Sequence, residues 1–174
     1  MKKSSKKLLA ALGAVLCVVA VVVVILVTVD FEKPSDYYGD GEEKENVSGV
    51  VTLEIRCDTV VGKSDNEYVP ANGVVLEKTQ FEIEDGDTVF DVLIEATKKN
   101  KMHIEHSGTT AVSNSKAYVT GLNYIYSGDF GDLSGWLFYV NGKTPSVGCG
   151  EFVLKDGDVV EFLYSCDMGS DLGR

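Results

Sequence analysis

The chain has 174 residues, 44% of them apolar and 25% charged, which excludes a wholly disordered chain, a collagen-like repeat and a multi-span membrane protein. Residues 1–29 contain four lysines and no acidic residue, whereas residues 30–174 hold 12 basic and 27 acidic residues, a formal net charge of −15. An acidic surface of this kind repels nucleic acid and anionic lipid, so both are excluded as partners of the folded part.

The first segment with a clear pattern is the uncharged run LLAALGAVLCVVAVVVVILVTV at residues 8–29. A helix of this length crosses a hydrocarbon core of about 30 Å. The lysines of the tail at 1–7 place that tail in the cytoplasm and the rest of the chain outside the cell. A cleaved signal peptide is the alternative, but its apolar region typically has only about 7–15 residues. The sequence therefore predicts a single-pass, cell-membrane signal anchor.

Residues 30–48 are acidic and show no apolar periodicity, which predicts a solvated extracellular linker. A single extracellular domain is then expected over residues 49–174. Alternating β-branched residues predict strands at 50–57 and 79–83. At 87–100 the spacing changes to one helix face, with Asp87 as the expected N-cap and lysines at the far end.

After this helix the sequence predicts five short strands, at 102–105, 117–122, 136–140, 151–154 and 158–165. Asn141-Gly142 and Asp156-Gly157 are typical of hairpin turns. The order of strands, one helix and further strands predicts an α+β domain with the helix packed on one face of a mixed sheet. A β-grasp-like arrangement, preceded by the transmembrane helix, fits this order.

No residue pattern indicates an enzyme or a metal site. Asp85-Gly86-Asp87 and its repeat at 156–158 could offer carboxylates to calcium, but calcium needs about six to eight oxygen ligands, and turn chemistry accounts for the same residues. His103 and His106 stand three apart, on opposite faces of a strand, with no third ligand nearby. Nucleophile-elbow, dinucleotide and phosphate-loop motifs are missing from the sequence.

Three cysteines lie outside the predicted span, and an extracellular location favours one disulfide. Cys149 and Cys166 flank the predicted last hairpin, and we predict that they form the bond. Cys57 with Cys166 is the alternative if the first and last strands are neighbours, and three reduced, buried thiols are another. Cys17, within the span, is expected to be a small apolar residue in lipid.

Aromatic residues gather between Tyr118 and Phe138. The stretch from Tyr126 to Gly135 is rich in glycine and polar residues, which predicts an exposed loop of the kind that often carries binding. Trp136 and Phe138 share one face of the following strand, where packing in the core and contact with a ligand are both open.

Several segments resemble one family: Asp85-Gly-Asp-Thr-Val89 before a helix, Tyr118-Val-Thr-Gly-Leu122, Ser134-Gly-Trp-Leu-Phe-Tyr-Val-Asn-Gly142, Leu154-Lys-Asp-Gly-Asp-Val-Val-Glu-Phe162 and Tyr164-Ser-Cys-Asp-Met-Gly169. The family is a bacterial domain family of unknown function that is similar to the C-terminal β-domain of transcobalamin and intrinsic factor. The resemblance covers about residues 50–169 and implies a β-grasp-like domain exposed on Gram-positive cells. In the vertebrate carriers this domain closes over cobalamin together with a helical domain.

The resemblance implies a membrane-anchored binding module for a corrinoid or another small ligand, which acts with a transporter or surface-protein partner and requires no cofactor. A structural or adhesive module that binds protein or glycan is the alternative, and neither is an enzyme. The ligand-binding residues that we predict from the loop and the tryptophan segment are Tyr126, Phe130, Gly135, Trp136, Phe138 and Asn141.

Overall fold

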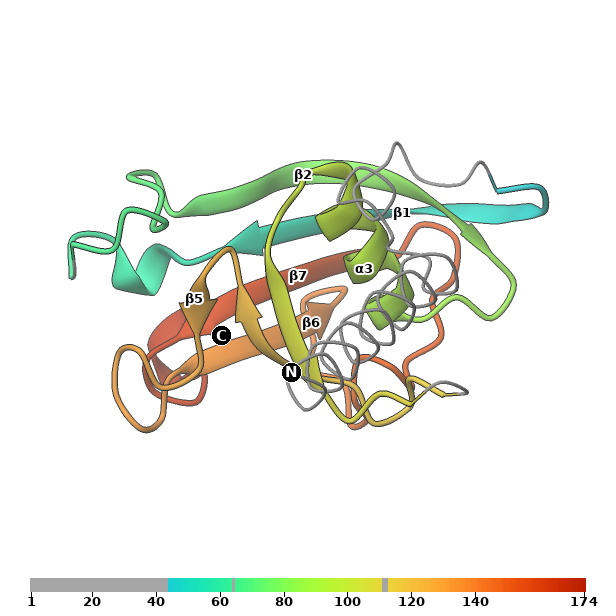
Figure 1. Cartoon of the computed structure of the whole chain (residues 1–174). Coiled ribbons are helices and arrows are strands. Elements are labelled where there is room, and N and C mark those ends of the chain that lie inside the picture. Colours follow the sequence, from blue (N-terminus) through green and yellow to red (C-terminus); the bar gives the residue numbers. More distant parts are fainter. Residues whose placement is uncertain (1–43, 64, 111–112) are drawn as a thin grey trace, which may run out of the picture. The chain divides into compact units, whose positions relative to one another are not determined.

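The computed structural model of the chain describes residues 44–63, 65–110 and 113–174 (Figure 1). The predicted tail at 1–7, the predicted membrane span at 8–29 and most of the predicted linker lie outside these residues. Within the described part, no helix is both long and apolar enough to cross a membrane.

A mixed four-stranded sheet in the order β2-β1-β7-β6 forms the centre of the described domain (Figure 1). Its strands are β1 at Val47–Arg56, β2 at Val74–Glu84, β6 at Gly135–Val140 and β7 at Val159–Ser165. β1 and β7 run parallel, with Leu53 opposite Val160, and the other two pairs are antiparallel.

The remaining described elements are shorter. They are the helix α3 at Val89–Lys99, the 3-10 turns η1 at Asp58–Val60 and η2 at Ser170–Leu172, and a second, antiparallel sheet in the order β3-β4-β5. In the second sheet β3 spans Ile104–Ser107, β4 spans Tyr118–Leu122 and β5 spans Ile125–Tyr126. The predicted α+β class, with a mixed sheet and a helix, is therefore confirmed.

One face of the four-stranded sheet carries the core. Alternate residues of β1 and β7 point to this face and are buried, among them Leu53, Ile55, Phe162 and Tyr164. Their partners come from α3 and the small sheet, whose buried residues include Leu93, Ala96, Leu122 and Ile125. This period of two explains why β1 and β7 form strands, because each places a continuous apolar row on one face.

The start of α3 differs from the prediction by one residue. Thr88, not Asp87, is the N-cap: its hydroxyl accepts a bond from the Asp91 N–H, and the Asp91 carboxylate accepts one from the Thr88 N–H at 2.9 Å. The carboxylate of Asp87 is engaged elsewhere, because it accepts bonds from the Glu84 N–H and from Lys44.

The predicted strand at 151–154 is wrong. The segment at 148–154 turns instead and meets the start of α3, where the Phe90 N–H donates to the Cys149 carbonyl and the Val89 N–H to the Phe152 carbonyl, both at 3.0 Å. The first turn of a helix has N–H groups without a partner inside the helix. This segment supplies carbonyls to two of them, which outweighs its tendency to pair as a strand.

The predicted bond between Cys149 and Cys166 is consequently absent, and the three described cysteines are free thiols. Because the predicted hairpin does not form, Cys149 and Cys166 contact different parts of the fold. The Cys149 thiol contacts the Ala117 carbonyl at 3.4 Å, whereas the Cys166 thiol lies 3.8 Å from the Thr59 carbonyl in η1.

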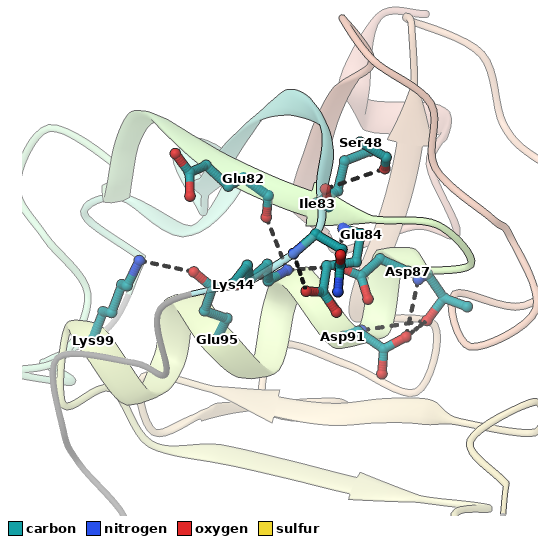
Figure 2. A network of polar contacts seen from close by, with 11 residues as sticks. Lys44, Ser48, Glu82, Ile83, Glu84, Asp87, Asp91, Glu95 and Lys99 are labelled. Carbon is teal, nitrogen blue, oxygen red and sulfur yellow. Dashed lines mark hydrogen bonds and ion pairs between the residues drawn. The ribbon is translucent and has the colours of Figure 1, made fainter.

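Where the chain enters the domain, one lysine fastens it to the helix (Figure 2). The Lys44 ammonium group pairs with Asp87 at 2.5 Å and Glu95 at 3.2 Å, and it also donates to the Glu82 carbonyl of β2. Burial alone would lower the pKa of Lys44, but the hydrogen bonds to the two carboxylates raise it. The entry point is thus fixed beside α3 and β2.

Candidate functional site

The predicted ligand-binding residues do not form one surface. Trp136 is only 5% exposed, its indole N–H donates to the Ile125 carbonyl at 2.8 Å, and its ring meets Tyr164 edge-on. Phe130 also packs edge-on against Tyr164, with ring centroids 5.7 Å apart. These two side chains are therefore part of the core packing.

Three more of the predicted ligand-binding residues have structural roles in β6 and in the turn that follows it. Phe138 stacks on Phe162 and is half-buried. Gly135 begins β6, where an added Cβ would lie 3.0 Å from the Ser127 hydroxyl. Asn141 has a φ of +52° in the tight turn after β6, and its side chain accepts from the Val159 N–H and donates to Asp158.

Tyr126 alone of the six belongs to an exposed cluster, which we call the aromatic face and define as Tyr68, His103, Tyr124 and Tyr126. The Tyr68 and Tyr124 rings are 4.4 Å apart and are 42% and 43% exposed. The His103 ring stacks on Tyr124 at 4.4 Å and meets Tyr126 at 5.7 Å. These are favourable separations for aromatic contacts, so the rings support one another.

Asn123 connects two parts of the aromatic face. The Asn123 side chain donates to the Tyr68 carbonyl at 2.9 Å, and its backbone N–H donates to the His103 carbonyl at 2.8 Å. The two residues between β4 and β5, Asn123 and Tyr124, have φ values of +50° and +59°. Such a pair is typical of a type I′ hairpin turn, but a tyrosine there is uncommon. The turn directs the Tyr124 ring to the surface.

The carboxylates of Glu105 and Asp129 lie near Tyr126 of this face. Desolvation, followed by the charges of Glu105 and Asp129, raises the pKa of Tyr126. The Asp129 carboxylate also accepts a bond from the Tyr126 N–H at 2.8 Å, which fixes its position beside the ring. The aromatic face therefore suits a neutral or cationic ligand better than an anionic one.

The two histidines have different neighbours. His106 meets the Phe90 ring edge-on, while the buried Nδ1 of His103 has no hydrogen-bond partner among the described residues. Across the same residues, no group of three histidine, cysteine or acidic side chains could hold a metal ion. His103 thus contributes its ring to the aromatic face rather than to a ligand set.

A cavity of about 190 Å³ lies beside η1 and η2, where β1 and β7 end, and is lined by Arg56, Asp58, Thr59, Leu163, Tyr164, Asp171, Leu172 and Arg174. Arg56 pairs with Glu54 and Asp58, and Arg174 pairs with Glu161. The Arg56 hydrogen bond lowers the pKa of Asp58. Because the cavity is smaller than about 300 Å³ and its arginines are paired with carboxylates, it suits a drug-sized ligand poorly.

Comparison with known proteins agrees with the resemblance seen in the sequence. Residues 86–165, from the turn before α3 to the end of β7, match a family model described as Domain of unknown function (DUF4430). The matched residues make up slightly less than half of the chain, and over them the chain is similar to the DUF4430 family. No curated protein matches the chain.

Two solved structures are similar to it. One is a candidate metal-binding protein from Ruminococcus gnavus ATCC 29149, at 10% identity and a TM-score of 0.42, over 67% of this chain and 96% of that one. The other is haptocorrin in complex with Cbi, at 17% identity and a TM-score of 0.45. That match covers 70% of this chain and 26% of haptocorrin, so the chain spans about a quarter of the carrier's length.

Sequence reasoning missed Tyr68, His103 and Tyr124 as a site. The loop that carries Tyr68 lies 55 positions from Asn123, and no local period connects them. The sequence carries one local signal of this site: Asn123-Tyr124 separates two short apolar segments, which indicates a tight turn that would expose the tyrosine.

Proposed function

We propose that the chain is a membrane-anchored extracellular binding module that holds a small ring-shaped ligand against the aromatic face. The observation that carries the proposal is the tilted pair of partly exposed rings of Tyr68 and Tyr124, with the His103 ring stacked on Tyr124. Exposed tyrosines in a braced turn supply contact area at low entropic cost. A β-grasp-like domain is the finer fold that we propose, supported by the parallel β1–β7 pair beside one helix.

A corrinoid is the ligand that we propose first, on the basis of the sequence resemblance. A corrin ring has an extended face that can lie on aromatic side chains, and the carboxylates of Glu105 and Asp129 favour a cationic form. One face buries only one side of such a ligand, whereas small-ligand sites usually bury most of it. We therefore expect weak binding by this chain alone and tighter binding with a partner protein that covers the other side.

A glycan is the second candidate. Sugar rings present C–H groups that pack on tyrosine, and Asn66, Asn123 and Asp129 lie close enough to the rings to offer polar groups at the rim of the face. This ligand would fit a structural or adhesive module on the cell surface. It differs from the corrinoid in having no charge, so its binding should depend little on salt.

Calorimetry on the full chain in phosphatidylcholine nanodiscs tests the proposal, with aquocobalamin, cobinamide and a panel of neutral glycans as ligands. We expect one ligand class to bind with a Kd on the order of 10–100 μM, and Tyr124→Ala to weaken it by about fivefold, since one aromatic contact is worth about 1 kcal/mol. Tyr118→Ala is the matched control, because Tyr118 is 57% exposed on β4 but lies outside the cluster. Equal losses in both variants would argue against the aromatic face.

We also propose that the module has no catalytic activity. The support is the lack, in the sequence, of nucleophile-elbow, dinucleotide and phosphate-loop motifs. Turnover of a bound ligand, measured as a chemical change in the ligand recovered from the calorimetry cell, would contradict this.

A further inference from the structure

The β6 strand ends the four-stranded sheet on one side, and its own residues lack the features that usually protect a sheet edge. Its sequence, GWLFYV, has no charged residue and no proline, and its register against β7 is regular throughout. The other edge strand, β2, carries Glu77, Lys78 and Glu82, and Lys44 bonds to its Glu82 carbonyl. Charges, prolines and irregular pairing are the devices that keep sheet edges from pairing with other chains. Within the strands themselves, β2 has such features and β6 has none.

The pairing pattern shows which backbone groups of β6 face outward. The Asn141 N–H donates to the Val159 carbonyl at 2.8 Å, so Tyr139, Leu137 and Gly135 bond to β7 in turn. The groups of Phe138 and Val140 therefore point away from the sheet. Val140 exchanges hydrogen bonds with Lys143 at 2.9 and 3.1 Å across the turn at Asn141-Gly142.

The chain thus begins another strand along this edge and then leaves it. After Lys143, the next residue that would exchange bonds with β6 is Pro145, opposite Phe138, and proline has no N–H to donate. The pairing stops at Lys143. No described residue bonds to the outward N–H or carbonyl of Phe138. An extended backbone could satisfy both groups.

We propose that the edge at Phe138 accepts an extended segment of a partner protein as a fifth, antiparallel strand. Its side chains would lie beside Leu137 on one face and Phe138 on the other, both half-buried, so apolar residues are favoured on both faces. The formal charge of −15 after residue 29 opposes pairing with a second copy and favours a segment with basic flanks. This interaction surface is separate from the aromatic face.

Fluorescence anisotropy with the full chain in phosphatidylcholine nanodiscs and a labelled peptide of sequence KKVTVTVTKK tests the proposal. We expect saturable binding, weakened about tenfold or more when the lysines are replaced by glutamates. Pro145→Val restores the missing N–H, so the chain's own segment should extend along the edge and reduce peptide binding by about tenfold or more. Phe138→Pro removes the outward donor and should have the same effect.

Pro70→Val is the control, since it makes the same exchange in the loop between η1 and β2 and should leave peptide binding unchanged. If Phe138→Pro fails to fold, Pro145→Val still carries the test. Absence of peptide binding, or binding that survives Pro145→Val at full strength, would overturn the proposal. Self-association in sedimentation that Pro145→Val abolishes would also overturn it, because the occupant would then be a second copy.

Discussion

The side chain of Trp136, the single tryptophan of the chain, is packed in the core and is therefore not available to a ligand. Its indole N–H is satisfied by the Ile125 carbonyl, and its ring lies between the two sheets against Tyr164. Removing such a side chain typically costs about 3–5 kcal/mol of folding free energy. A Trp136→Ala variant would therefore report on unfolding rather than on ligand contact, and Tyr124 is the better position for a binding variant.

The buried thiols are the second residue-scale feature with a measurable consequence. Burial raises the pKa of both Cys57 and Cys149 to about 11 from an ordinary value of 9. In the unfolded chain these thiols ionise near pH 9, whereas in the folded chain they stay protonated. Their contribution to stability is therefore complete below pH 9 and is lost as the pH rises toward 11.

We predict that urea unfolding of the reduced full chain in detergent, followed by Trp136 fluorescence, shows this loss of stability between pH 9 and 11. The double variant Cys57→Ala, Cys149→Ala should have a smaller pH dependence over the same interval. Peptide mapping without reduction should find all three described cysteines free, with Cys166 alkylated fastest because it is the least buried of them. A bridge between any two would contradict the structure.

At the scale of elements, the sequence predicts β1, β7 and the helix well, because each of them has a period that local residues define. β1, β7 and α3 agree with the predicted ranges to within three residues at each end. The segment at 148–154 could not be predicted, since its partner is the start of α3, about 60 positions earlier in the chain. The aromatic face escaped prediction for the same physical reason: contacts distant in sequence assemble it.

The helix start gives a prediction at this scale. Thr88→Ala removes the hydroxyl that accepts from the Asp91 N–H, and we expect a loss of about 1 kcal/mol in the free energy of unfolding. Thr144→Ala is the control, because Thr144 is exposed and outside the helices and strands. Urea unfolding measures both. Equal effects would show that the capping box contributes nothing specific.

At the scale of the whole molecule, we propose a membrane anchor that is followed by an acidic extracellular domain. The anchor is a proposal from residues 8–29 and the lysines before them. We predict that N-terminal sequencing of membrane-extracted protein begins at Met1 or Lys2. Protease added to intact cells should remove the domain. A mature chain that begins near Asp30 would instead indicate a cleaved signal peptide.

The central claim is that ligand contact occurs on the aromatic face and not on the tryptophan strand. NMR spectra of the full chain in nanodiscs, with ¹³C-labelled tyrosine rings and ¹⁵N-labelled indole, test it most directly during titration with cobinamide or the best glycan. We predict that the ring signals of Tyr68, Tyr124 and Tyr126 shift, while those of Tyr118 and the Trp136 indole N–H hold their positions. Shifts centred on Trp136, with Tyr68 and Tyr124 unaffected, would contradict the claim.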